Sequence, residues 1–109
     1  MALVNANLNG KPVVRGTLLA SQTTNTNGTW QPLSNVRPLA ITVSGDFAGT
    51  VELYATSAHT PPADSDNNQF LLANFTAPGN YASEIGYRWI KARTTGMSGG
   101  TANVDVTAG

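Results

Sequence analysis

His59 is the only histidine in this chain of 109 residues, so catalysis that depends on an imidazole must use it. Serine hydrolysis needs such a base in contact with a nucleophile, together with a third group that orients the base. His59 lies in the proline-rich sequence SAHTPP, and a catalytic histidine needs the complete constellation around it. We therefore expect His59 to be an exposed loop residue. The chain has no cysteine, which excludes thiol nucleophiles, disulfides and thiolate metal sites.

The sequence DSDNN provides the best candidate for a metal site. Asp64, Asp66 and Asn68 have the spacing of the first ligands in a calcium-binding loop. Gln69 then stands where the sharp turn of that loop requires glycine, and Phe75 stands where a bidentate glutamate belongs. The pattern favours a polar loop, with a calcium site of another kind at Asp64 and Asp66 as the alternative. We expect no metal and no cofactor.

Two glutamates, Glu52 and Glu84, fall in separate expected strands and could form a carboxylate pair of the glycosidase type. Glu52, however, alternates with the apolar residues Val51 and Leu53, which points its side chain outward among polar neighbours. Surface solvation is therefore the preferred interpretation, and we expect no enzyme activity.

The densest basic and aromatic cluster is YRWIKAR, at residues 87–93. Strand alternation places Arg88 with Ile90 and Ala92 on one face, and Trp89 with Lys91 and Arg93 on the other. Such a cluster could stack on single-stranded nucleic acid or on sugar. Because the net charge is zero, a strand whose faces meet the core and a protein interface is favoured over nucleic-acid binding. Trp30 is the other large anchor, expected to close the sandwich or to fill a pocket in a neighbour.

The charge balance and the lengths of the apolar stretches argue against several classes of protein. Six basic and six acidic residues balance to zero, and charged residues make up 11% of the chain. This composition argues against a nucleic-acid partner and against a polybasic membrane patch. No stretch is long enough to cross a bilayer, and the opening MALVNANLNG has neither the basic cluster nor the apolar length of a signal peptide. A surface of small polar residues suits packing against other protein.

Short alternating runs rich in β-branched and aromatic residues, separated by Gly, Pro, Asn and Asp, predict an all-β protein. We expect an antiparallel β-sandwich, of the jelly-roll or immunoglobulin-like type, with seven or eight short strands. The expected strands are 11–20 (kinked at Gly16), 37–44, 50–55, 69–75, 80–85, 87–94 and 101–106. Residues 69–75 are apolar on both faces, which predicts a central strand or one covered by a partner. Residues 56–68 form the longest irregular stretch.

Two segments repeat one pattern: VSGDFAGTVEL at 43–53 and TTGMSGGTANV at 94–104. When they are aligned, Gly45 matches Gly96 and Gly49 matches Gly100. Glycine is the residue that adopts positive φ without strain, so we interpret both segments as hairpin-forming corners between strands. Their role is then structural. The chain should form one domain, in which residues 1–35 supply an N-terminal arm and the first strands and residues 36–109 supply the rest.

Residues 38–107 resemble small β-sandwich structural proteins of tailed bacteriophages. The motifs that carry the resemblance are G-x-F-x-G-T-V-x-L, T-A-P-G, an aromatic-W-x-(K/R)-(A/V)-R strand and a T-G-x-x-(S/G)-G-T-A-x-V ending. The matching residues are Gly45, Phe47, Gly49, Thr50, Thr76, Ala77, Pro78, Gly79, Trp89, Arg93, Gly96, Gly100, Thr101 and Val104. The loop at 56–68 departs from the pattern of that group, in which a shorter stretch is common, and residues 1–35 do not match it.

The resemblance implies a virion component, foremost a capsid decoration (cement) protein on the outer surface of the head, made in the host cytoplasm. Its partners would be the major capsid protein and further copies of itself, with a trimer favoured among homo-oligomers. The arm at 1–14 would then dock by strand addition. The candidate interface residues are Leu3, Val4, Val13, Val14, Trp30, His59, Pro61, Pro62, Arg88, Trp89, Lys91 and Arg93. Two alternatives are a tail or head-fibre module that contacts the host surface, and a carbohydrate-binding sandwich with Trp30, Tyr87 and Trp89 as stacking surfaces.

Overall fold

The computed structural model describes residues 4–8, 11–62 and 69–109 as an all-β protein, which confirms the predicted fold class. The described residues form nine strands in two antiparallel sheets, and no helix. The strands are β1 (Val4–Leu8), β2 (Lys11–Gln22), β3 (Gln31–Pro32), β4 (Leu39–Ser44), β5 (Ala48–Thr56), β6 (Phe70–Phe75), β7 (Gly79–Ser83), β8 (Trp89–Gly99) and β9 (Ala102–Ala108). The prediction was about seven or eight short strands; β1 and the two-residue β3, which carry little sequence pattern, are the two strands that the sequence did not indicate.

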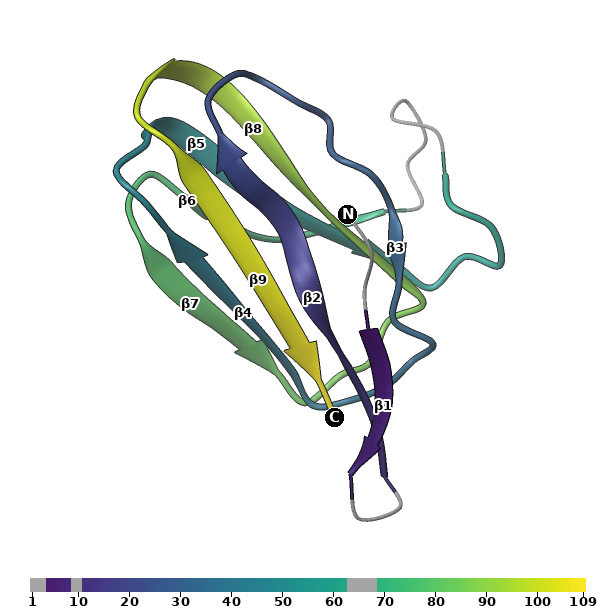
Figure 1. Cartoon of the computed structure of the whole chain (residues 1–109). Coiled ribbons are helices and arrows are strands. Elements are labelled where there is room, and N and C mark those ends of the chain that lie inside the picture. The colour runs from purple at the N-terminus through teal and green to yellow at the C-terminus, as the bar shows by residue number, and fades with distance from the viewer. Residues whose placement is uncertain (1–3, 9–10, 63–68) are drawn as a thin grey trace.

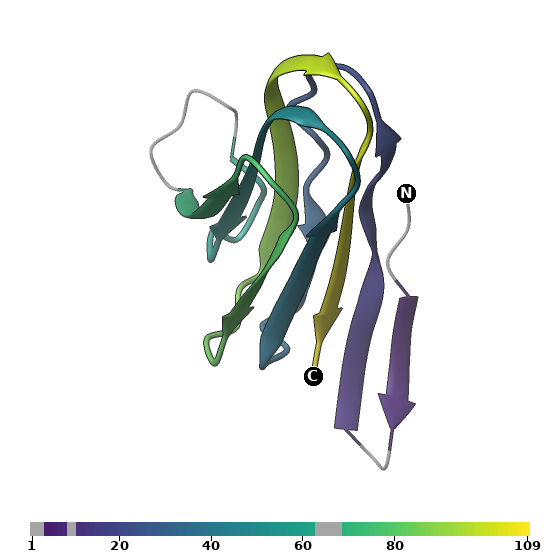
Figure 2. The same ribbon diagram turned by 90° about the vertical axis from the view of Figure 1, so that its left-hand side faces the viewer.

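The strand order is that of a jelly roll rather than an immunoglobulin-like sandwich. One sheet has the order β1-β2-β9-β4-β7 and the other β3-β8-β5-β6 (Figures 1 and 2). Strands β2 to β9 pair as β2 with β9, β3 with β8, β4 with β7 and β5 with β6. This is the pairing of one long hairpin rolled into two four-stranded layers, and β1 extends the first layer by one strand.

The core lies between the two sheets, where the expected alternation holds. Leu39, Ile41 and Val43 of β4 are buried, and the residues between them are exposed. Val51 and Leu53 of β5 are fully buried against them. The apolar side chains of β9 point inward in the same way, while Asn103 and Asp105 point outward. Because each face has one environment, a slip of one residue in register would expose the whole core set.

The two repeated segments form neighbouring corners at one end of the sandwich (Figure 1). The predicted positive φ is confirmed at Gly45 (110°), Gly49 (149°), Gly96 (61°) and Gly100 (73°). The corners are not hairpins within a sheet, however: β4 and β5 belong to different sheets, as do β8 and β9. Each corner therefore carries the chain from one layer to the other.

A carboxylate ties the two corners together. Asp46 Oδ1 accepts hydrogen bonds from the backbone N–H of Thr101 at 3.0 Å and from its hydroxyl at 3.4 Å. The backbone bond to Thr101, the largest cause, lowers the pKa of Asp46 below its ordinary value. A Cβ added at Gly100 would clash with the backbone carbonyl of Asp46, and one at Gly45 would clash with that of Thr101. The glycines thus permit close packing of the corners as well as positive φ.

The described part of the N-terminal segment forms the edge strand β1 and the start of β2. Residues Val4–Leu8 pair in antiparallel register with the start of β2, which continues as one strand from Lys11 to Gln22. Val14, an interface candidate, is a core residue with 2% of its surface exposed, because β2 is an inner strand of its sheet. The kink expected at Gly16 corresponds to a register shift between Thr17 and Leu19.

Residues Phe70–Phe75 form the edge strand of the four-stranded sheet, so the central-strand interpretation of residues 69–75 was wrong. Apolar residues on both faces indicated burial on both faces. Instead, Phe70 and Leu71 are about half exposed, while Ala73 and Phe75 are partly buried against the core. The alternative, a strand covered by a partner, stays a prediction.

Candidate functional site

The outer face of β8 carries three of the predicted interface residues. Ile90 and Ala92 are buried in the core, so Trp89, Lys91 and Arg93 project from the opposite face of the sheet, as predicted. On this face Lys91 pairs in register with Tyr54, and Arg93 pairs with Glu52 of β5. We call Trp30, Glu52, Tyr54, Lys91 and Arg93 the outer cluster.

Lys91 is the buried centre of the outer cluster. The residue is only 3% exposed, and its Nζ lies 4.8 Å from the centroid of the Trp30 ring and 5.7 Å from that of Tyr54. An ammonium over aromatic faces is attracted by the ring quadrupole, which offsets part of its desolvation. Lys91, an interface candidate, is therefore packed against side chains of its own chain. Because Lys91 is buried, its ammonium group contacts the rings of Trp30 and Tyr54.

Trp30 links the outer cluster to the loop after β5. Its indole Nε1 donates a hydrogen bond of 3.1 Å to the backbone carbonyl of Pro62. Pro62 itself is buried, which corrects the expectation that this part of the loop would be available to a partner. The neighbouring candidates His59 and Pro61 are exposed, as a solvated loop requires. Trp30 therefore packs against its own chain on the outside of the sheet.

Glu52 and Arg93 form an ion pair on the same face. Arg93 Nε lies 3.5 Å from Glu52 Oε1, and the Tyr54 hydroxyl donates a hydrogen bond of 3.4 Å to Glu52 Oε2. Burial, followed by the negative charge of Glu52, raises the pKa of Tyr54 above its ordinary value, and Arg93 opposes this. Glu52 is thus half-buried and paired, rather than solvated as expected. Glu84 is exposed beyond the end of β7 in the other sheet, so the two glutamates do not form a catalytic pair.

Trp89 carries an unusual polar atom at the start of β8. Its Nε1 is buried and has no hydrogen-bond partner in the described part of the chain. A buried unpaired N–H is destabilising by roughly 1–3 kcal/mol, so most such groups are paired. Nothing in the described surroundings explains this group. Arg88, the residue before it, is exposed and free of the cluster's ion pair.

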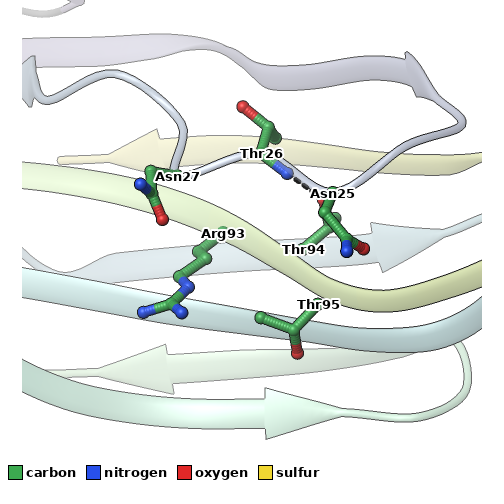
Figure 3. A pocket seen from close by; sticks show the side chains of 6 residues that line it. All are labelled: Asn25, Thr26, Asn27, Arg93, Thr94 and Thr95. Atoms are coloured by element: carbon green, nitrogen blue, oxygen red, sulfur yellow. Dashed lines mark hydrogen bonds between the residues drawn. The ribbon is translucent and has the colours of Figure 1, made fainter.

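A small open pocket lies beside the outer cluster, where the loop after β2 runs along β8 (Figure 3). Its volume is about 230 Å³, and Asn25, Thr26, Asn27, Arg93, Thr94 and Thr95 line it. The loop is held in place by a hydrogen bond of 3.0 Å from the Thr26 N–H to the Thr94 hydroxyl. The sequence did not point to this pocket, because its two sides are 66 or more residues apart. Its amide, hydroxyl and guanidinium groups can bind polar ligands but include no nucleophile–base pair.

One motif escaped the sequence interpretation. Residues 96–100, GMSGG, have the G-x-S-x-G spacing of a serine-hydrolase nucleophile, which normally sits on a turn from strand to helix. Here Gly96–Gly99 are the last residues of β8 and Gly100 follows it, so the segment leads into the strand β9 rather than into a helix. Trp89 pairs with Thr56, three residues before His59, so Ser98 lies nine residues along β8 from the histidine's end, roughly 30 Å away. The only histidine cannot activate this serine.

The remaining expectations fall on other parts of the chain. The candidate calcium ligands Asp64, Asp66 and Asn68 lie outside the described residues, as does Leu3, and the side chain of Val4 is not described. Among the residues that are described, no three His, Cys, Asp or Glu side chains form a group that could hold a metal ion. The described residues also form no helix that is long and apolar enough to span a bilayer.

The described residues therefore form a packed outer cluster, a polar pocket and sheets whose edge strands pair with no other described strand. Comparison of the chain with known protein families, with curated proteins and with solved structures found no match.

Proposed function

We propose that the protein is a non-enzymatic structural protein of a phage virion. It would bind the outer surface of the head as a decoration protein and bridge neighbouring major capsid subunits. The sequence resemblance over residues 38–107 supports this proposal. The resembling glycines have a clear structural purpose in this chain, since they form the two interlocked corners.

The observation that carries the proposal is a neutral sandwich with apolar side chains at free strand edges. Phe70 and Leu71 lie on the edge strand β6, and Ile85 lies in the loop after β7, all three well exposed. Exposed apolar groups on a soluble body of zero net charge suit contact with other protein. Each such contact can be modest, because many copies bound to one lattice add their affinities.

The charged groups of the outer cluster interact with each other and with aromatic rings, which favours a partner without a large net charge. Arg93 is paired with Glu52, and the Lys91 ammonium lies against two aromatic rings. Neither group is presented as part of an open basic stripe of the kind that binds nucleic acid. Docking would then depend on shape and apolar burial, which matches a protein shell better than a polyanion.

The decisive experiment is the copy number of this chain in purified particles. A decoration protein is expected in the order of hundreds of copies per head, because it binds at every equivalent lattice position. Cosedimentation with isolated heads, and not with isolated tails, would accompany that number. A handful of copies, with labelling of host cells by the purified protein, would instead establish the tail or head-fibre alternative.

A truncation tests whether the N-terminal hairpin is the tether. Removal of residues 1–10 deletes β1 and leaves β2 in place, whereas removal of residues 1–14 would also delete the core residue Val14. The shorter truncation is expected to keep a native far-UV circular dichroism spectrum and to abolish binding to heads. Binding at the full-length level by this variant would exclude β1 as the tether.

The polar pocket favours a second candidate function, carbohydrate binding. Asn25, Asn27 and Arg93 offer hydrogen-bonding groups around a space of about 230 Å³, which suits a single sugar unit. Trp30, packed on Lys91 in the same sheet face, would report binding by its fluorescence. A saturable shift with a host polysaccharide that Asn27→Ala removes would favour this function. The absence of any shift would leave the structural role.

A further inference from the structure

The strand β6 has one backbone edge to which no described strand is paired. It ends the order β3-β8-β5-β6, and together with β7 of the other sheet it forms the left margin of the sandwich in Figure 2. Among the described residues, the exposed large hydrophobic side chains are Phe70 (56%), Leu71 (49%) and Ile85 (60%). Two of these three begin β6. The free edge and the exposed apolar surface therefore coincide.

This edge lacks two of the features that usually keep strands from pairing with other chains, namely charged residues and proline. Natural edges are protected by charged side chains, especially lysine, or by proline within the strand. No charged residue occurs between residues 69 and 83, and the strand itself contains no proline. A strand that pairs with this edge must accordingly be neutral, since nothing here would compensate a charge.

The strand is also irregular in a way that matters for its partner. Its register with β5 shifts at Leu72, between the Leu53–Ala73 and Tyr54–Leu71 pairs. As a result Phe75 lies opposite the buried Val51, and Phe70 lies opposite the buried Ala55, although the two phenylalanines are five residues apart. Without the bulge, an odd spacing would place them on opposite faces.

The sequence FLLANF is therefore complementary to itself. If two copies of β6 pair antiparallel about a twofold axis, Phe70 lies opposite Phe75 of the second copy, and both face the inside of the sandwiches. Leu71 then lies opposite Asn74 of the second copy, and both face outward with Tyr54 and Glu52. Every outer residue meets an outer residue, and each end of the pair joins two phenylalanines. Cross-strand aromatic pairs of this kind stabilise antiparallel sheets.

We propose that the partner of the β6 edge is a second copy of this chain, bound through antiparallel β6–β6 pairing. The two four-stranded sheets would become one sheet of eight strands, with the order β3-β8-β5-β6-β6-β5-β8-β3. This twofold contact buries the exposed Phe70 and Leu71 of both copies. The dimer uses two of the three exposed apolar side chains named for the proposed function and leaves Ile85 exposed for another partner, so either proposal can fail without the other. The dimer also differs from the trimer that the resemblance implies.

The first test compares two equally exposed positions in the full-length chain. Sedimentation equilibrium should show a dimer for the unmodified protein. Phe70→Glu places a carboxylate against an aromatic ring at both ends of the pair and should weaken dimerisation at least about tenfold. Ile85→Glu adds the same charge at a similar exposed fraction outside β6 and should leave the dimer unchanged. A monomer at about 1 mM for the unmodified chain would overturn the proposal.

A cross-link tests the register independently, and it does not depend on loss of a contact. The chain has no cysteine, so Leu71→Cys and Asn74→Cys can be introduced without background. Within one chain these positions are about 10 Å apart along the strand, too far for a disulfide. The double variant should oxidise to a covalent dimer, while each single variant should stay largely monomeric on non-reducing gels. A dimer in solution with no cross-link in the double variant would assign the interface to another surface.

Discussion

At the scale of single residues, Trp30 has two roles that substitution can separate. Its ring covers the Lys91 ammonium at 4.8 Å, and its indole N–H binds the Pro62 carbonyl. Trp30→Phe keeps an apolar ring but loses the N–H, so we expect a loss of about 1 kcal/mol in the free energy of unfolding. Trp30→Ala loses both, with an expected loss of about 3 kcal/mol. Urea unfolding followed by circular dichroism measures each value. Equal losses in the two variants would contradict a role for the ring over Lys91.

Tyr54 of the outer cluster should make the free energy of unfolding fall as the pH rises into the alkaline range. Burial, with Glu52 adding to it, raises the pKa of Tyr54 above its ordinary value of 10.0. The unfolded chain therefore releases this proton first as pH rises. The contribution is fully present below pH 10 and is lost as pH rises through the pKa of the folded state. We expect the free energy of unfolding to fall between about pH 9 and pH 12, and to fall less in Tyr54→Phe. Parallel curves for the two proteins would exclude this contribution.

At the scale of strands and corners, periodicity predicted what depends on local alternation. The alternation of inward and outward residues in β5 and β8 was predicted, and so were the positive φ angles at the four corner glycines. The order of strands in a sheet depends on long-range pairing, which a local pattern does not contain. For this reason a central strand was one of the two interpretations of residues 69–75, beside a strand covered by a partner, and the change of sheet at each corner was not anticipated.

The two glycines of the β8–β9 corner should differ in their tolerance of a side chain. Both have positive φ, 61° at Gly96 and 73° at Gly100, so alanine carries similar backbone strain at either position. A Cβ at Gly96 would meet no atom within 4 Å, whereas one at Gly100 would clash with the Asp46 carbonyl. We expect Gly96→Ala to destabilise by about 1 kcal/mol and Gly100→Ala by about 3 kcal/mol or more. Thermal unfolding of both variants measures the difference, and equal values would show that the corners can separate without loss.

At the scale of the whole molecule, the candidate site was less predictable than the fold. The sequence identified Trp30, Lys91 and Arg93 as important side chains, but it assigned them to an interface. Their partners Pro62, Tyr54 and Glu52 come from other strands or loops, and only the folded chain shows that these groups satisfy one another. The polar pocket was missed for the same reason. The balance of six basic and six acidic residues, in contrast, can be counted directly from the sequence.

That neutrality leads to a prediction about how the molecule associates. Six positive and six negative charges balance over 109 residues, and the described β6 edge carries none of them. Added salt screens contacts between charges but leaves apolar burial intact or strengthens it. Both the β6 dimer and attachment to heads should therefore change less than about twofold when NaCl is raised from about 0.05 to 0.5 M, where the Debye length falls below about 5 Å. Sedimentation equilibrium and salt washes of particles measure the two associations. If either association weakens tenfold or more at high salt, charge pairs hold the protein in place, and docking through apolar edges is the wrong mechanism.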